Sequence, residues 1–395
     1  MTVLFALAGG CRVWGADEPQ FLQQMLNLQR FQALCRWTND CPPIRVMIYG
    51  QSITGQPWTT QMVGDVQARF PGHQWNVVNR CLSGTPSQDL IYSTDADVFP
   101  FNPDLIIFHC YGDTNLYAQI IAHMRARTTS DILIINDHYV HWDSLSDPGI
   151  GLWDGQVLPD IALLYGACMA DIRTPWKEYL VTHNLPISAL TLDGLHPNAT
   201  GQALLRQYAG AYAHGPSLQP SPDPYNCPRA LRVKIPSDAR ASGIWQLPFT
   251  GTRVTARVGA GDASILVDGV PPSGLVGGAV HTRSSLWPGT GWWPALRKVD
   301  CAAPMLPERW KVHIDKLISS NSFQFSVTGS VTGPDGSGST AAEFRSTSGR
   351  VVIEPVYWWW NGLVGTLTNG MEFTWNAVAT GADSVHRSAG ASATW

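Results

Sequence analysis

Val46-Met47-Ile48-Tyr49-Gly50-Gln51-Ser52 is the stretch that decides the fold class, because four apolar residues run without interruption into a polar turn. An apolar run of this length is typical of a strand that is buried on both faces. Similar runs follow at 75–78, 105–108 and 132–135, with helix-like segments at 57–70, 116–127, 158–183 and 200–213. This alternation predicts an α/β fold in which helices cover both faces of a parallel sheet.

The length and the composition divide the chain into four regions. At 395 residues the chain is longer than one typical domain. Residues 1–43 are predicted to be an N-terminal helical extension, with helical spacing over 18–36 that Pro42-Pro43 ends. The α/β domain is expected over 44–214 and a Pro- and Ser-rich linker over 215–228. Short β-type runs between Gly-rich turns predict a β-sandwich over 229–395.

The composition argues against several classes of partner. The net charge is −4 and no Lys/Arg run is present, so nucleic acid is not expected. No apolar stretch is long enough to span a membrane, and no Cys/His spacing indicates a metal site. The apolar residues 3–11 resemble a truncated secretory signal, which a downstream start site or an ordinary buried segment would explain equally well. We expect a secreted or periplasmic protein, and the sequence leaves disulfide pairing and oligomeric state open.

Ser52 occupies the position that is most interesting for chemistry. It follows the strand candidate 46–49 directly, and ligands bind at the carboxyl ends of strands in open α/β sheets. A helix beginning just after Ser52 would direct backbone N–H groups and its dipole toward the hydroxyl. The alternative is that Ser52 only caps this helix.

Leu192-Asp193-Gly194-Leu195-His196 supplies the partners that a serine nucleophile needs. A serine hydroxyl is inert until a base removes its proton, and a carboxylate must orient the imidazole. Asp193 and His196 are three residues apart, before the helix-like segment 200–213, and both can reach one site. Gly84 follows the second strand and Asn115 the third, where a backbone N–H and a side-chain amide could stabilise an oxyanion. For each motif alone, the alternative is an ordinary turn.

The order of these four elements resembles the SGNH/GDSL hydrolases over residues 44–212. The resemblance implies a flavodoxin-like three-layer α/β/α domain and a serine esterase that needs no metal or other cofactor. It makes Ser52 the nucleophile, Asp193 and His196 its acid and base partners, and the N–H groups of Ser52 and Gly84 oxyanion donors. Asn115 would be the third donor. No G-x-S-x-G elbow is present, which argues against an α/β-hydrolase.

Two positions depart from the family pattern. Gln51 replaces the Asp that usually precedes the nucleophile, and Thr114 stands where the family has its Asn, with Asn115 one residue later. Either the loop is one residue longer, or the third donor is lost or supplied by another group. Gln51 and His138, which follows the fourth strand, are candidates for contacts to substrate. For His138 the alternative is a polar residue at a strand end.

The substrate predicted from the resemblance is an acetylated oligo- or polysaccharide. The 17 tryptophans and the low charge agree with binding a neutral sugar ring. Trp292-Trp293 and Tyr357-Trp358-Trp359-Trp360 could form a stacking platform, or could equally be core and domain interface. A lipase or thioesterase of the same fold is one alternative function. A non-catalytic carbohydrate-binding protein on a decayed hydrolase scaffold is another, motivated by the displaced Asn115.

Overall fold

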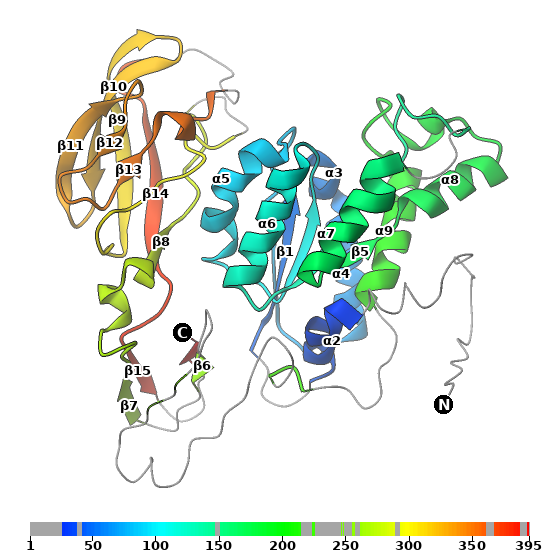
Figure 1. Ribbon diagram of the computed structural model, residues 1–395, viewed down its shortest axis with the longest axis horizontal. Coiled ribbons are helices and arrows are strands. Elements are labelled where there is room, and N and C mark those ends of the chain that lie inside the picture. The colour runs from blue at the N-terminus through cyan, green and yellow to red at the C-terminus, as the bar shows by residue number, and fades with distance from the viewer. Residues whose placement is uncertain are drawn as a thin grey trace.

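The computed structural model describes residues 26–37, 42–146, 151–214, 223–225, 246, 248, 255–256, 261–288, 293–360, 367–387 and 393–394. Figure 1 shows an α/β domain beside a β-rich domain. The predictions for residues 1–25 and for most of the linker 215–228 lie outside the described residues. Within the predicted N-terminal extension, the turn η1 (Leu26–Leu28) leads into the helix α2 (Gln29–Arg36).

A five-stranded parallel sheet forms the centre of the α/β domain. Its strands are β1 (Ile44–Gly50), β2 (Trp75–Asn79), β3 (Leu105–His109), β4 (Asp131–Ile135) and β5 (Cys168–Ala170). They lie in the order β2-β1-β3-β4-β5, and every neighbouring pair is parallel. This is the flavodoxin-like order of a doubly wound sheet, whose ligands bind at the carboxyl ends of the strands near the switch point between β1 and β3.

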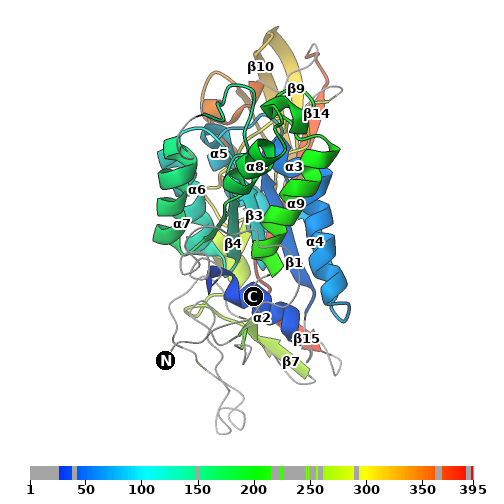
Figure 2. The ribbon, with the colours of Figure 1, turned by 90° about the vertical axis from the view of Figure 1, so that its right-hand side faces the viewer.

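Helices cover both faces of this sheet (Figures 1 and 2). One face carries α5 (Ser87–Val98), α6 (Thr114–Arg127) and α7 (Leu158–Tyr165), and the other carries α2, α4 (Pro57–Arg69), α8 (Arg173–Thr182) and α9 (Ala199–His214). Successive strand residues alternate between the two cores: Val46 and Ile48 face one, and Met47 and Tyr49 face the other. The predicted three-layer α/β/α fold, which the SGNH/GDSL resemblance implies, is confirmed.

The prediction of one helical segment over 158–183 is wrong in its middle. Helix α7 ends at Tyr165, because Gly166 takes a left-handed conformation with φ +59° and caps it. The strand β5 follows within three residues, and α8 begins at Arg173. The sequence pattern also does not predict α5, because several of the positions that this helix buries are polar.

The second domain is rich in β structure, as predicted. Its main sheet is antiparallel, in the order β11-β10-β9-β14-β8. These strands are β8 (Ala279–His281), β9 (Glu308–Ser319), β10 (Ser322–Gly329), β11 (Gly333–Ser339) and β14 (Glu372–Ala379). Three short pairs join β12 (Phe344–Arg345) to β13 (Val352–Ile353), β7 (Gly261–Ser264) to β15 (Ser384–Arg387), and β6 (Thr255–Ala256) to β16 (Ala393–Thr394). The finer expectation of two stacked sheets stays a prediction.

Two neighbouring tryptophans connect the cores of both domains. Trp358 is buried in the aromatic core of the β-rich domain, where its ring stacks on Trp287. Trp359 is fully buried in the core that α5, α6 and α7 share with the sheet. Neither can offer a face to a sugar, so the stacking interpretation is wrong for these two and the interpretation as core and interface is confirmed. Trp292 lies outside the described residues.

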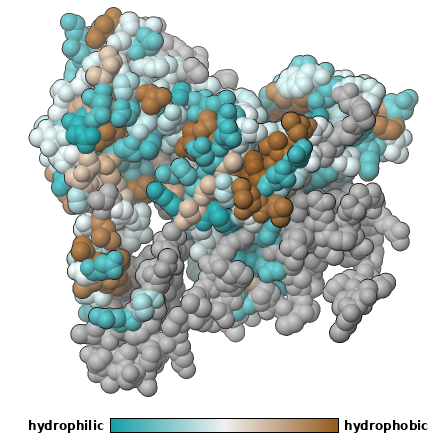
Figure 3. Space-filling model, viewed as in Figure 1, coloured by the Kyte–Doolittle hydropathy of each residue, from teal (hydrophilic) through white to brown (hydrophobic). Residues whose placement is uncertain are grey.

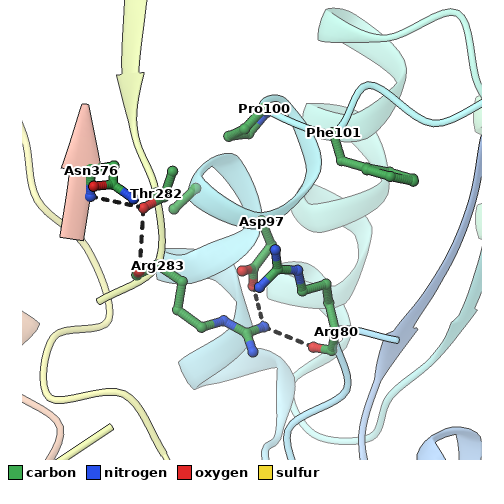
Figure 4. A pocket seen from close by; sticks show the side chains of 8 residues that line it. Arg80, Asp97, Pro100, Phe101, Thr282, Arg283 and Asn376 are labelled. Atoms are coloured by element: carbon green, nitrogen blue, oxygen red, sulfur yellow. Dashed lines mark hydrogen bonds and ion pairs between the residues drawn. The ribbon is translucent and has the colours of Figure 1, made fainter. Parts of the chain in front are cut away.

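The two domains meet along α5. Asp89 pairs with Arg297 at 2.9 Å near the start of the helix. Near its end, Asp97 pairs with Arg283, which also donates to the carbonyl oxygen of Arg80 over 2.7 Å (Figure 4). A hollow of about 360 Å³ remains there between α5 and the strands β8 and β14. These ion pairs and Trp359 hold the β-rich domain against the helix that follows the loop containing Gly84.

Leu163 and Leu164 of α7 are exposed. Figure 3 shows an apolar area over this helix. None of the helices in the described ranges has the length and apolar character needed to cross a membrane.

Candidate active site

Ser52 lies where β1 ends, at the first residue of the one-turn helix α3 (Ser52–Gly55). Gly50 makes this turn possible, because its φ is +131° and a Cβ there would lie 1.8 Å from the carbonyl oxygen of His109 on β3. The backbone N–H of Gln51 donates to that same oxygen over 3.2 Å. The ends of β1 and β3 are therefore locked together, and the partly exposed Ser52 side chain stands at their junction.

The loop between η3 (Ile187–Leu190) and α9 carries Asp193 and His196. Asp193 Oδ1 accepts from the backbone N–H groups of Leu195 (3.0 Å) and His196 (2.7 Å). Gly194 turns the chain between them with φ +84°, packed against His141. The hydrogen bond of 2.8 Å from the N–H of Leu192 to the carbonyl of His196 closes the loop.

The ring of His196 connects this loop to Ser52. Its Nδ1 lies 2.8 Å from Asp193 Oδ2, and its Nε2 lies 3.0 Å from Ser52 Oγ. An ionised carboxylate can only accept, so Nδ1 carries the proton and Nε2 offers a lone pair to the hydroxyl. The backbone and side-chain donors of His196, with the N–H of Leu195, hold the pKa of Asp193 well below its usual range. The structure thus brings together the three predicted residues, whose catalytic roles stay a prediction.

Gly84 lies in the exposed loop between β2 and α5. Its φ is +68°, which favours glycine. The hydroxyl of Tyr111 donates to its carbonyl oxygen over 3.1 Å, and Trp293 Nε1 of the β-rich domain donates to the carbonyl of Ser83 over 2.7 Å. The Trp293 ring would contact a Cβ at position 84 at 3.5 Å. The loop predicted to offer an oxyanion donor is therefore held from two sides, one of them in the second domain.

Asn115 is the second residue of α6 and its side chain is exposed. The helix begins at Thr114, because Asp113 is an effective N-cap whose side chain accepts from the N–H of Leu116 over 2.9 Å. None of the hydrogen bonds found among the described residues joins Asn115 to Ser52. Its predicted role as the third oxyanion donor stays open.

The structure places both candidates for contacts to substrate inside the protein, and their contact with substrate stays a prediction. Gln51 is only 6% exposed, and its side chain bonds inward to Ser52 and to His109. His138 is buried against Trp176, and its Nε2 donates to the carbonyl of Leu195 over 2.7 Å. Burial lowers the pKa of His138 to about 4, so the ring stays neutral above that pH. Both side chains support the site from behind.

A second histidine–aspartate pair, which is not among the residues predicted from the sequence, lies behind Ser52. His109 Nδ1 lies 3.0 Å from Gln51 Nε2, and His109 Nε2 lies 2.6 Å from Asp137 Oδ1. His109 is the last residue of β3, and Asp137 follows the end of β4 by two residues. The rule that polar residues at the carboxyl ends of parallel strands converge would have pointed to both.

Charged groups surround Asp137. Its backbone N–H donates to Asp154 over 2.8 Å, and Arg173 lies 3.5 Å from Asp154 and 3.1 Å from Asp143. Burial, with the neighbouring Asp137 charge, raises the pKa of Asp154 to about 7. Within the described part of the chain, no group of three or more His, Cys, Asp or Glu side chains could hold a metal ion.

Three solved structures are each similar to less than half of the chain. The acetylxylan esterase Axe2 from Geobacillus stearothermophilus is 19% identical, with 44% of this chain and 97% of that chain covered and a TM-score of 0.38. LAE5, an alpha/beta hydrolase enzyme from the metagenome of Lake Arreo in Spain, is 18% identical, with 44% and 97% covered and a TM-score of 0.37. A protein described as a GDSL-like lipase from Parabacteroides merdae is 13% identical, with 44% and 96% covered and a TM-score of 0.37.

No protein-family model and no curated sequence matches the chain. The three likenesses have identities below 20% and TM-scores below 0.5. They therefore assign neither a residue role nor a substrate to this chain.

Proposed function

We propose that this protein is a serine ester hydrolase of the SGNH/GDSL type that removes acyl groups, and acetyl groups above all, from carbohydrate. One observation carries the proposal: Ser52 Oγ, the His196 ring and the Asp193 carboxylate form one hydrogen-bonded series with links of 3.0 and 2.8 Å. A hydroxyl, an imidazole and a carboxylate in this order are the minimal apparatus for acyl transfer through a covalent ester.

The proposed reaction has two halves. In the first, His196 Nε2 takes the proton of Ser52 while Oγ attacks the ester carbonyl carbon. The same proton then passes from His196 to the departing alcohol oxygen as the bond to that oxygen breaks, which leaves an acyl group on Ser52. In the second half, His196 takes a proton from water, the water oxygen attacks the acyl carbon, and the proton returns to Ser52 as the acid leaves. Asp193 holds the His196 tautomer and stabilises the imidazolium.

Backbone N–H groups are the proposed oxyanion donors. The N–H of Ser52 opens α3, where a helix has no internal acceptor for it. The N–H of Gly84 is the second proposed donor, in the loop that Trp293 and Tyr111 hold. The side chain of Asn115 is the third candidate of the proposal.

Exposed aromatic side chains beside the site support a carbohydrate substrate. Trp142 is 67% exposed, next to the residue whose N–H donates to the carbonyl of Gly194. On the Gly84 side, Tyr111 is 43% exposed and Trp293 is partly exposed. Rigid amphipathic rings of this kind suit the C–H faces and hydroxyl edges of sugars. We therefore propose an acetylated oligo- or polysaccharide as the substrate. The proposal also includes a location of the protein outside the cytoplasm.

A fluorophosphonate probe and a substrate panel test the proposal. We expect the wild type to be labelled and Ser52→Ala to stay unlabelled, because the probe reacts with an activated serine. We also expect acetate release from acetylated polysaccharides and faster turnover of short than of long acyl chains. Faster turnover of long chains would favour a lipase or thioesterase.

The position of Asn115 favours one second candidate, a carbohydrate-binding protein without activity. Its exposed place in the first turn of α6 weakens the expected set of oxyanion donors. Binding of a polysaccharide by a wild type that neither labels nor releases acetate would establish this candidate.

A further inference from the structure

The side chain of Gln51 has a defined orientation. Its Oε1 accepts from the backbone N–H of Ile53 over 3.3 Å and lies 2.8 Å from Ser52 Oγ. Because a backbone N–H can only donate, the oxygen of the amide must be on this side. The amide nitrogen Nε2 is then the atom that lies 3.0 Å from His109 Nδ1.

The orientation of Gln51 fixes the tautomer of His109. The amide nitrogen donates, so His109 Nδ1 must be unprotonated and must accept. The ring proton is therefore on Nε2, which donates to Asp137 Oδ1 over 2.6 Å. His109 is 2% exposed, so water cannot readily replace either partner.

We propose that His109 and Asp137 are positioning residues that act through Gln51 to hold the Ser52 hydroxyl beside His196. This inference rests on the proposed function of Ser52. The oxygen Oγ lies 2.8 Å from Gln51 Oε1 and 3.0 Å from His196 Nε2. The single proton of Ser52 can be donated either to Gln51 Oε1 or to His196 Nε2, and Oγ lies between these two acceptors, within reach of the base before substrate arrives.

The arrangement requires a neutral His109 ring. A second proton on His109 would place an N–H against the N–H₂ of Gln51, so the amide would have to turn and present its nitrogen to Ser52. The groups that face His109 are Asp137 at Nε2 and Gln51 at Nδ1, and three further charged or titratable side chains surround Asp137, namely His138, Asp154 and Arg173. Cys110 and Tyr117 also lie close to Asp137. The form of His109 that keeps the Gln51 oxygen beside Ser52 is therefore the neutral ring with its proton on Nε2.

The test compares rates of fluorophosphonate labelling across a range from about pH 5 to about pH 9. Gln51→Leu removes both links and should slow labelling about 10²-fold, since a displaced nucleophile loses that order of rate. Asp137→Asn keeps the volume but weakens the link to His109, and about a tenfold loss is expected. The pH profile of labelling should differ between the wild type and Gln51→Leu, because in the variant His109 no longer contacts the side chain beside Ser52. His281→Gln is the matched control, since His281 is also buried and hydrogen-bonded but lies in the β-rich domain.

A second measurement does not depend on activity. In the full chain with ¹⁵N-labelled histidine rings, His109 should carry its proton on Nε2 at neutral pH, and Gln51→Leu should shift its Nδ1 signal. Wild-type labelling rates and pH profiles in folded Gln51→Leu and Asp137→Asn would overturn the inference. If the wild type is not labelled by the probe, the proposed function fails, and the ¹⁵N spectrum of His109 then tests the inference by itself. A proton on Nδ1 of His109 would overturn the inference. A proton on Nε2, with an Nδ1 signal that shifts in Gln51→Leu, would support it.

Discussion

Asp193 makes three hydrogen bonds inside its own loop, two from backbone N–H groups and one from the His196 ring. The backbone N–H of His196 contributes most to lowering the pKa of this carboxyl below its ordinary value. Asp193 is therefore ionised wherever a histidine titrates, although its side chain is half exposed. The carboxylate is available to orient His196 throughout that pH range.

The first prediction concerns Asp193→Asn. The amide can present N–H₂ toward His196 Nδ1, which favours the tautomer with its proton on Nε2 and so removes the lone pair that faces Ser52. We expect kcat for an aryl acetate to fall about 10⁴-fold with little change in melting temperature. A loss smaller than about tenfold would show that His196 does not need this carboxylate.

The second prediction concerns His138, whose pKa burial lowers to about 4. An unfolded histidine titrates near 6.5, so the unfolded chain takes up this proton first as the pH falls. The stability that the neutral ring contributes is complete above about pH 6.5 and is lost progressively toward pH 4, by about 3 kcal/mol at most. Urea unfolding at pH 7.5 and pH 4.5 should show a smaller pH difference in His138→Gln than in the wild type. Equal differences would contradict the prediction.

At the scale of elements, two strand ends and one loop build the site. The contact of Gly50 with the His109 carbonyl joins β1 to β3, and the loop before α9 delivers His196 to that junction. This loop packs against His141 at Gly194. A Cβ added at position 194 would lie 2.8 Å from the His141 side chain. The position of His196 therefore depends on a glycine in this loop.

The third prediction compares Gly194→Ala with Gly269→Ala. Both glycines have φ above +80°, but a Cβ at position 269 meets no atom within 4 Å. Each substitution carries a similar backbone cost of about 1 kcal/mol, whereas only Gly194→Ala must move the loop of Asp193 and His196. We expect Gly194→Ala to lower kcat about 10²-fold and Gly269→Ala to leave it unchanged. Equal activities in the two variants would show that His141 yields without moving the loop.

At the scale of the whole molecule, a tryptophan of the β-rich domain is buried inside a core of the α/β domain. Trp359 belongs to the chain of the β-rich domain but is buried among residues of the α/β domain. Its removal leaves a cavity in the layer that supports β1 and β3. The stability of the two domains should therefore be linked.

The fourth prediction concerns Trp359→Ala. We expect a loss of about 3–5 kcal/mol and a thermal transition that separates into two, because the cavity weakens the link between the domains. Trp142→Ala is the control, since that side chain is 67% exposed and should change stability by no more than about 0.5 kcal/mol. A single transition with an unchanged midpoint in Trp359→Ala would contradict the linkage.

Much of the α/β domain could be predicted, since its strands are buried on both faces and the apolar runs reveal them directly. The strand β5 could not, because three residues between two helices carry too short a pattern. The helix α5 could not be predicted either, because it buries polar side chains such as Ser93 and Asp97 and so lacks a clear apolar face. Packing of tertiary structure, rather than local pattern, decides these elements.

Some residues of the candidate site could be predicted from the sequence and others could not. The spacing of Asp193 and His196 shows in sequence, because both lie in one loop. His109 and Asp137 come from different strands and contact Gln51 only through the register of the sheet. The orientation of the Gln51 side chain is set by its hydrogen bond from the backbone N–H of Ile53, a contact that side-chain patterns in the sequence do not reveal. Sequence patterns report neighbours along the chain, and these contacts join residues that are distant along it.

The hydrogen bond from Trp293 to the carbonyl of Ser83 bears on how such a protein could be re-engineered. A chimera in which another binding module replaces the C-terminal half would lack the Trp293 side chain, which holds the loop of Gly84 through this hydrogen bond. Such a chimera would keep Ser52, His196 and Asp193 but would need a substitute anchor for that loop. Transplanting the α/β half together with a short segment that carries Trp293 is the more promising route.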